Sequence, residues 1–261
     1  MSKFSNEYNI NVDNTYPFNY RLTPVALSMF VQDTVARFLT SKNLASFHII
    51  KDNLIWIIKE MNIDLIQDLP FWTEDIKIEI WVSEISVLKV YTDYKVYHND
   101  ELIAQGNILW LIIDKNTKKT YRPDKFVDKL EQIDELVLGP HTKFSLPEQK
   151  EKHVEITYKI NQGDVDHNDH VNNRSYIRIA ELTAPQGFEQ THMLKKLKIK
   201  FNKETFLDDI LTCTAYTTET PNNFVHKITK ENDSICDIET LWAERTDNTT
   251  IAECNLNLIK Q

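Results

Sequence analysis

The chain has 261 residues, of which 41% are apolar and 26% are charged, a composition typical of globular proteins rather than of disordered or fibrous ones. Its formal net charge of −9 disfavours general binding to nucleic acid, which needs a concentrated basic surface. The first residues are polar and no apolar run is long enough to cross a bilayer, so we expect a cytoplasmic protein that does not act at a membrane.

Glycine and cysteine usage narrows the class further. The four glycines form no GxGxxG or P-loop pattern, which disfavours the common nucleotide-binding folds. Cys213, Cys236 and Cys254 are odd in number and lack CxxC spacing, so we expect small core residues rather than disulfides or zinc ligands. The sequence therefore implies no cofactor and no metal.

In the first half, an opening strand is followed by a helix predicted over residues 22–39. Thr23 and Pro24 stand in its capping and first-turn positions. Apolar residues occur almost all round this helix, which predicts that other structure surrounds it. Strands are predicted after it over residues 76–82, 87–98 and 103–113.

The second half repeats this order after a segment rich in charges and containing prolines, which predicts a connector. An opening strand precedes a helix over residues 175–182. Strands are then predicted over residues 194–201, 210–217, 224–229 and 235–245. The expected domains are an N-terminal unit over 1–125, a connector over 126–150 and a C-terminal unit over 151–261.

The halves also match residue by residue. Residues 94–110 read YKVYHNDELIAQGNILW and residues 226–242 read HKITKENDSICDIETLW. The two blocks align without a gap and end on Trp110 and Trp242, about half the chain apart. A duplicated unit with one buried helix and an antiparallel sheet predicts an α+β tandem double hotdog, each sheet wrapped around one long central helix.

Residues 163–182, GDVDHNDHVNNRSYIRIAEL, gather acids, amides and imidazoles before the second helix. A calcium loop is disfavoured because Asp169 and Ser175 stand where glycine and glutamate are needed. His167 and His170 could share zinc, but no cysteine or HExxH context is nearby. Singly, each Asp or Asn is more often a cap or turn residue. Together they adjoin a helix N-terminus, whose unpaired N–H groups can stabilise an oxyanion.

The run 166–173, DHNDHVNN, followed by Tyr176 and Ile177, resembles the D-x-N-x-H-V-N-N-x-x-Y-I motif of the acyl-acyl carrier protein thioesterase family. The segments PFW at 70–72 and IWV at 80–82 are similar to the proline–tryptophan turn and following strand of that family. The resemblance implies a tandem hotdog hydrolase that releases free fatty acid and holo-acyl carrier protein. Its partner would be acyl carrier protein bearing a fatty acyl chain.

The resemblance also implies the site residues. The catalytic set is Asp166, Asn168, His170 and Glu204, the last standing at the family's distance from the motif histidine. We expect Glu204 to be buried beside an acyl tunnel and to activate water, while His170 and Asn168 orient the reactants and Asp166 fixes them by hydrogen bonds. Backbone N–H groups are expected to form the oxyanion hole, at Val171, Asn172 and Asn173.

Thr205 follows Glu204, where many family members have a cysteine. Threonine without an evident strong base is a poor nucleophile, so Thr205 is at most an auxiliary residue. Hydrolysis is then expected to use water, or direct attack by a carboxylate. Which carboxylate acts stays open at this point.

The sequence indicates the residues that would contact the substrate less specifically than the catalytic residues. The first half lacks the motif and resembles the part of the family that shapes the acyl cavity, so Val25, Met29 and Phe30 are candidate cavity residues or plain core. Lysines alternate with apolar residues in the strand before Glu204 and could dock the acidic carrier protein or form a solvated face, namely Lys196, Lys198 and Lys200. A second basic cluster lies in a turn, at Lys115, Lys118, Lys119 and Arg122.

Two other functions stay open. The hotdog fold hosts several reactions, so an acyl-coenzyme A thioesterase or another hotdog enzyme is the main alternative, and a non-catalytic acyl-binding protein is a third. Acyl chain length cannot be deduced from the sequence. A homodimer is compatible with the family, although a tandem chain already supplies the usual hotdog pair.

Overall fold

The structure, a computed structural model, describes residues 3–166 and 169–245. The first half of the chain contributes the strands β1 (Phe4–Asn9), β2 (Leu54–Leu65), β3 (Asp75–Ile85), β4 (Val90–His98), β5 (Glu101–Asp114) and β6 (Thr120–Tyr121). The second half contributes β7 (Lys152–Lys159), β8 (His192–Phe201), β9 (Ile210–Thr217), β10 (Asn223–Lys230) and β11 (Asp233–Glu244). The α-helices are α1 (Pro24–Ser41), α2 (Ser46–Ile49), α3 (Asn173–Glu181) and α4 (Phe188–Thr191), and the 3-10 helices are η1 (Val12–Asn14), η2 (Ile50–Asp52), η3 (Pro123–Lys125), η4 (Val127–Lys129) and η5 (Gln162–Asp164).

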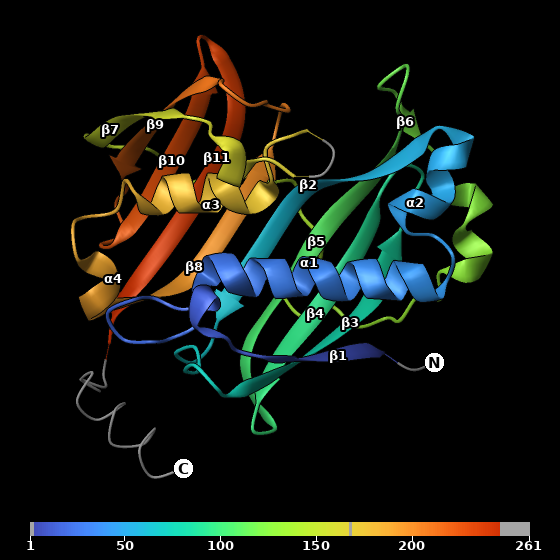
Figure 1. Cartoon of the computed structure of the whole chain (residues 1–261), viewed down its shortest axis with the longest axis horizontal. Helices are drawn as coiled ribbons and strands as arrows, with labels where there is room; N and C mark the ends of the chain where they lie inside the picture. The colour runs from blue at the N-terminus through green and yellow to red at the C-terminus, as the bar shows by residue number, and fades with distance from the viewer. Residues whose placement is uncertain (1–2, 167–168, 246–261) are drawn as a thin grey trace.

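The strands form one sheet in the order β1-β3-β4-β5-β2-β8-β11-β10-β9-β7, with β6 beside β5. Both halves follow the same path from an outer first strand to a central strand, and β2 and β8 pair in the middle. Helices α1 and α3 lie on one face of the sheet (Figure 1). The predicted α+β tandem double hotdog is confirmed, with the helix of the second half, α3, spanning 9 residues and that of the first half, α1, spanning 18.

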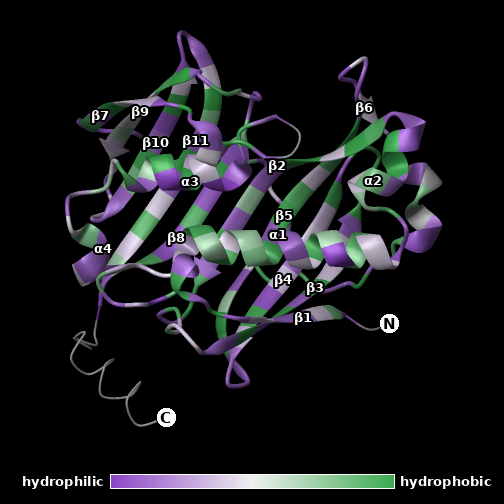
Figure 2. Cartoon of the chain, viewed as in Figure 1, coloured by the Kyte–Doolittle hydropathy of each residue, from purple (hydrophilic) through white to green (hydrophobic). Residues whose placement is uncertain are grey.

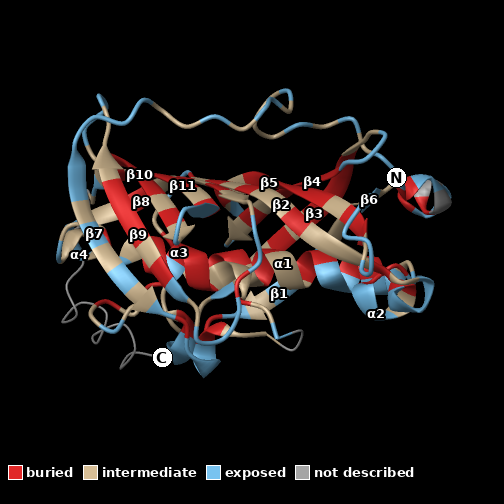
Figure 3. Ribbon diagram, turned by 90° about the horizontal axis from the view of Figure 1, so that it is seen from above, coloured by how far each residue is buried: buried red, intermediate tan, exposed pale blue. Residues whose placement is uncertain are grey.

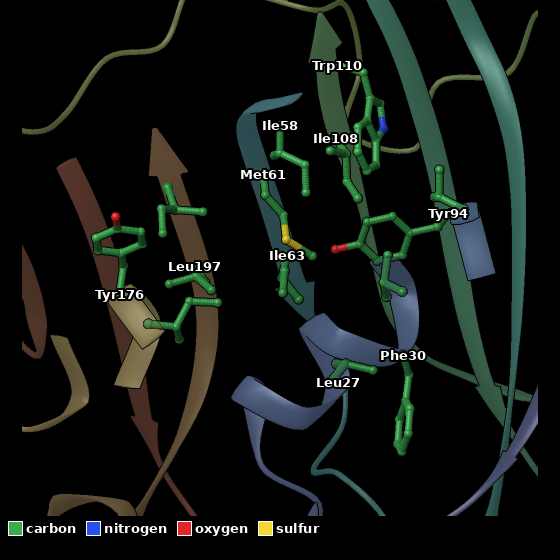
Figure 4. Close-up of a cluster of buried hydrophobic side chains, with 14 of the residues drawn as sticks. Leu27, Phe30, Ile58, Met61, Ile63, Tyr94, Ile108, Trp110, Tyr176 and Leu197 are labelled. Atoms are coloured by element: carbon green, nitrogen blue, oxygen red, sulfur yellow. The ribbon is translucent and has the colours of Figure 1, made fainter. Parts of the chain in front are cut away.

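The seam between the halves has two chemically different faces. Met61 and Ile63 of β2 are fully buried, and their side chains lie on the side of α1, near Leu27 (Figure 4). The residues between and beside them point to the other face, because side chains alternate along a strand. They are polar and stand opposite lysines of β8, in the pairs Glu60–Lys200, Asn62–Lys198 and Asp64–Lys196. The stripes of opposite hydropathy across the strands reflect this alternation (Figure 2).

The helix ends differ from the predicted ones for local reasons. The Thr23 hydroxyl accepts a hydrogen bond from the Ala26 N–H (3.1 Å), so α1 begins at Pro24 rather than at Leu22. Helix α3 begins two residues before the predicted start, because the Asn172 side chain caps the N–H of Arg174 (3.1 Å). The predicted strands are all present, but residues 87–89 belong to the turn before β4.

The segment between η4 and β7 crosses the sheet on the face opposite α1 and α3 (Figure 3). It is attached there by hydrogen bonds: the Trp81 indole donates to the carbonyl of Glu135 (2.8 Å), and the N–H of Val137 donates to the buried Asp93 carboxylate (2.8 Å). A cavity of about 480 Å³ lies between this segment and the sheet. Within the described ranges, no helix has the length and apolarity that a membrane span requires.

Candidate active site

The acid–amide–histidine loop lies against the segment that follows β8. The N–H of Val171 donates to the carbonyl of Thr205 (2.9 Å), so the residues on either side of this bond are brought together. This contact joins the start of α3 to the chain just beyond the central seam of the sheet. His170 and Glu204, the neighbours of the two bonded residues, are thereby placed side by side.

His170 and Glu204 approach each other at the molecular surface. The Nδ1 atom of His170 is 3.8 Å from Oε1 of Glu204, and the imidazole packs edge-on against the ring of Phe206 with centroids 5.2 Å apart. Their side chains are 30% and 38% exposed, respectively. The expectation that Glu204 would be buried is therefore wrong, because the segment after β8 leaves the sheet at this point. Water has direct access to the pair.

Asp166 fixes the backbone of His170. The N–H of Asp166 donates to the carbonyl of His170 (2.8 Å), and the Asp166 carboxylate accepts a bond of 3.4 Å from the His170 N–H. Asp169 between them has a φ of +62°, a left-handed conformation that aspartate tolerates better than most residues. These bonds hold Asp166 and His170 together and fix the backbone that carries the imidazole. The predicted catalytic residue Asn168, like His167, lies outside the described residues.

The predicted oxyanion hole is only partly available. The N–H of Val171 is bonded to Thr205, and the N–H of Asn172 donates to the carbonyl of Asp164 (2.8 Å). Both N–H groups donate within the protein in this structure, so they are not free to form the predicted oxyanion hole. Asn173 is the first residue of α3, where an N–H has no partner within its own helix, and no bond from it is found among the described residues. Asn173 is the remaining candidate donor.

Thr205 is buried and already paired. Its hydroxyl lies 2.7 Å from the phenolic oxygen of Tyr176, and neither side chain reaches the surface. Burial raises the pKa of Tyr176 well above its usual value, so this tyrosine stays neutral and cannot serve as a base for the threonine. The buried hydrogen bond of Thr205 therefore helps to hold the adjacent residue Glu204 in position.

A second polar group anchors the approach to α3. The fully buried Asp164 carboxylate accepts hydrogen bonds from Arg178 (2.5 Å), from the Tyr158 hydroxyl (3.0 Å) and from the N–H of Asn161 (3.0 Å). Three donors thus satisfy the hydrogen-bonding capacity of this buried acid, which offsets the cost of removing it from water. The network sets the direction in which the chain enters the site loop.

The candidate acyl-binding residues of α1 separate in the structure. Phe30 points away from the central strand β2 (Figure 4) and stacks on Tyr8 of the outer strand β1, with ring centroids 4.5 Å apart. Val25 is partly buried against the core. Met29 lies nearest the site, since its sulfur is 2.7 Å from Nη1 of Arg174 in the first turn of α3. Of the three, Met29 connects the first half to the loop that carries His170.

The three candidate docking lysines line the opposite face of the sheet. Lys196 and Lys198 border the cavity beneath the connecting segment, and the ammonium of Lys200 lies 5.7 Å from the ring centroid of Phe144 in that segment. Lys198 also pairs with Glu239 at 3.4 Å. Their docking role stays a prediction, and the geometry places them on the face away from α3.

Two contacts of the site were not predicted. Lys118, in the turn between β5 and β6, places its ammonium 3.2 Å from Oε2 of Glu204. Phe206 supplies the ring beside His170. The sequence features that could have indicated these contacts are the basic cluster at 115–122 and Phe206, which soon follows Glu204. Neither feature indicates a contact between segments that are distant in the sequence.

The first half has the same scaffold without the chemistry. The N–H of Leu22 donates to the carbonyl of Pro70 (2.8 Å), as that of Val171 does to Thr205. By this register, a leucine precedes Pro70 where the second half has Glu204, and an arginine precedes Leu22 where the second half has a histidine. At this register the first half therefore has no counterpart of the His170–Glu204 pair. In the same residues no cluster of His, Cys, Asp or Glu is suited to a metal.

Comparison with known proteins agrees with this fold. Residues 1–130 match the acyl-ACP thioesterase N-terminal domain, and residues 147–244 match the acyl-ACP thioesterase C-terminal domain. Oleoyl-acyl carrier protein thioesterase 2 of Arabidopsis thaliana is 26% identical over 78% of this chain and 56% of its own length. A palmitoyl-acyl carrier protein thioesterase of Gossypium hirsutum is 24% identical over 62% of this chain and 41% of its own. The chain thus spans about half the length of the curated relatives it matches.

Solved structures show the same fold at low identity. An acyl-ACP thioesterase from Bacteroides thetaiotaomicron superposes with a TM-score of 0.80 at 20% identity, covering 93% of this chain and 100% of that one. The 12:0-ACP thioesterase from Umbellularia californica gives a TM-score of 0.77 at 14% identity, covering 93% and 98%. Together with the two domain matches, which span both halves, these likenesses lead to one conclusion: the chain belongs to the acyl-ACP thioesterase family.

Proposed function

We propose that this protein hydrolyses the thioester of acyl-acyl carrier protein, releasing free fatty acid and holo-acyl carrier protein. The single observation that carries the proposal is the approach of His170 to Glu204, at 3.8 Å, beside the N-terminus of α3. A carboxylate and an imidazole within reach of water are the groups that thioester hydrolysis needs. Family membership supplies the substrate class.

In the proposed reaction, Glu204 takes a proton from a water molecule as the water oxygen bonds to the thioester carbon. The electron pair of the carbonyl moves onto oxygen, where the Asn173 N–H can stabilise the negative charge. The C–S bond then breaks. The departing sulfur takes up the proton held by Glu204, passed through His170, so the carboxylate is regenerated and the free acid is formed. Asn168 completes the set implied by the family motif.

Direct participation of Thr205 is not part of this scheme. Its hydroxyl is buried and bonded to Tyr176, so it has no path to a carbonyl at the surface. Water is the nucleophile that fits the exposure of Glu204. In this scheme the acyl chain passes Met29, the α1 residue in contact with the first turn of α3.

The test is thiol release from acyl-acyl carrier proteins of graded chain length, with the matching coenzyme A esters measured in parallel. We expect faster hydrolysis of the carrier-protein esters and a chain-length optimum. Replacing Glu204 by glutamine is expected to lower kcat by about 100-fold or more. The matched control is Glu131→Gln, an exposed glutamate two residues after η4.

Three results would contradict the proposal. Faster cleavage of the coenzyme A esters would reassign the substrate. Absence of thiol release from both series, with acyl ligand still bound by the folded protein, would leave an acyl-binding role. Full activity of Glu204→Gln would remove this residue from the chemistry.

A further inference from the structure

Glu204 is contacted by both halves of the chain. Its Oε1 atom faces His170 of the second half, and its Oε2 atom lies 3.2 Å from the ammonium of Lys118, which belongs to the first half. The two partners therefore occupy different oxygens of one carboxylate. The first half, which has no counterpart of the His170–Glu204 pair at the equivalent position, still supplies a charged group to the site.

The turn that carries Lys118 is rigidly built. The Asp114 carboxylate accepts hydrogen bonds from the N–H groups of Asn116 (3.0 Å) and Thr117 (2.8 Å), and these backbone contacts lower the pKa of Asp114. The N–H of Lys118 donates to the Asp114 carbonyl (2.8 Å), and its φ of +56° is unfavourable for a residue with a Cβ. A conformation of this kind persists where the surrounding bonds determine it.

The same turn is tied to the centre of the fold. The N–H of Lys115 donates to the carbonyl of Asn53 (2.9 Å), the residue just before β2. Because β2 pairs with β8 and Glu204 follows β8 closely, both ends of the Lys118–Glu204 contact start from the central seam. The lysine is thus presented at a defined place and not by a freely moving loop.

We propose that Lys118 is a positioning residue for Glu204: its ammonium holds Oε2, so that Oε1 stays directed at His170 and at the attacking water. The inference rests on the proposed function. Glu204 itself stands on an irregular segment with a side chain 38% exposed, and among the described residues its carboxylate has only His170 and Lys118 as polar partners. A base that must take a proton in one geometry reacts more slowly when its rotation is unrestrained.

A docking role makes a different kinetic prediction. Lys118 is 54% exposed, so it could instead attract the acidic carrier protein. A docking residue changes KM for the carrier-protein ester and does not affect a small neutral substrate. A positioning residue changes kcat for both. An acyl N-acetylcysteamine thioester, which carries no charge, separates the two roles.

The experiment compares Lys118→Met, Lys118→Arg and the control Lys119→Met on the acyl-carrier protein ester and on the neutral thioester. Lys119 is the adjacent exposed lysine of the same turn and has no ion pair within the described residues. We expect Lys118→Met to lower kcat about tenfold on both substrates with KM nearly unchanged. Lys118→Arg should restore most of the activity, and Lys119→Met should match the parent protein.

Other outcomes overturn the inference. A rise in KM confined to the carrier-protein ester would assign Lys118 to docking, and parental kinetics of Lys118→Met would leave it without a role. Glu204→Gln, measured alongside, distinguishes failure of the positioning role from failure of the proposed reaction. If Glu204→Gln is inactive while Lys118→Met is normal, the positioning role fails and the proposed reaction stands. If Glu204→Gln is fully active, the proposed base and its positioning residue fail together.

Discussion

The hydroxyl of Thr205 lies 2.7 Å from the phenolic oxygen of Tyr176, with both side chains buried beneath the acid–imidazole pair. At the position where the family resemblance implies a cysteine in many members, this chain has a threonine whose hydroxyl shares a buried hydrogen bond with Tyr176. The position serves structure here, since a group that faces the interior cannot attack a substrate at the surface. In the proposed reaction, any effect of Thr205 passes through Glu204, the residue directly before it.

Thr205→Val is therefore expected to lower the free energy of unfolding by about 1–2 kcal/mol, because the phenol of Tyr176 loses its buried partner. The value of kcat should change by only a few fold. Urea unfolding and thiol release measure the two quantities. Tyr176→Phe combined with Thr205→Val should cost less than the sum of the single changes, since both partners are then removed. A drop in kcat of about 100-fold in Thr205→Val, reversed in Thr205→Ser, would show that the hydroxyl takes part in the chemistry.

Asp164→Ala is expected to be among the more destabilising changes near the site, lowering the free energy of unfolding by about 2–3 kcal/mol. The buried carboxylate is the shared acceptor of Arg178 and Tyr158, but the guanidinium is 47% exposed and recovers solvation. This exposure keeps the expected cost below that of a fully buried ion pair. Chemical unfolding with Asp52→Ala, a change at an exposed acid, gives the comparison. Equal stability of the two variants would contradict the anchoring role.

Gly106→Ala is expected to prevent normal packing of the first half. An added Cβ would stand 2.0 Å from the carbonyl oxygen of Asn62 and 2.3 Å from the hydroxyl of Tyr94, and the first of these is backbone that cannot rotate away. We expect a loss of about 3 kcal/mol or more, or failure to fold. Gly139→Ala meets no atom within 4 Å and suffers only from its φ of +75°, so it should cost about 1 kcal/mol. Thermal unfolding of both variants tests the difference.

Stability should fall as the pH is lowered through the range where His226 would be protonated in the unfolded chain. This histidine is buried between the hydroxyls of Thr183 (2.7 Å) and Thr240 (2.8 Å), and desolvation lowers its pKa to about 3. The Thr183 hydroxyl donates to the carbonyl of Ala180, so it must accept from Nδ1–H of His226. In the neutral imidazole, Nε2 is then the acceptor for the hydroxyl of Thr240.

Between about pH 6.5 and the folded pKa of about 3, the unfolded chain binds this proton and the folded protein does not. Stability therefore rises with pH across this window, by up to ~1.4 kcal/mol per pH unit from this group. His226→Gln should flatten the slope of unfolding free energy against pH over the same range. An unchanged slope would show that His226 is not the titrating group.

The repeated block at 94–110 and 226–242 was sufficient to predict the architecture, because matched strands of a duplicated fold occupy matched places. Lys95 and Lys227 do lie on the equivalent strands β4 and β10. The strand β2 was not predicted, since LIWIIKEMNIDL opens with an apolar run that lacks alternation. That strand turned out to be central, where both of its edges are paired.

The site was predictable only where neighbours in sequence act together. The motif around His170 could be recognised along the chain, and its distance to Glu204 came from the family resemblance. The contact of Lys118 with Glu204 depends on a turn and a strand end that meet through the fold, so no local pattern indicates it. The exposure of Glu204 likewise follows from where the chain leaves the sheet, which residue types do not encode.

The pairing of β2 with β8 has a consequence for synthesis on the ribosome. Strand β8 pairs with one edge of β2, and the paired residues are separated by more than half the chain. This edge of β2 therefore stays unpaired until β8 has been translated. An open apolar edge of this kind would promote association between nascent chains. Glu60 and Asp64 stand on that edge, and their like charges would repel a second copy until the lysines of β8 arrive. The acidic residues that line the seam in the folded protein thus also reduce association between incompletely synthesised chains.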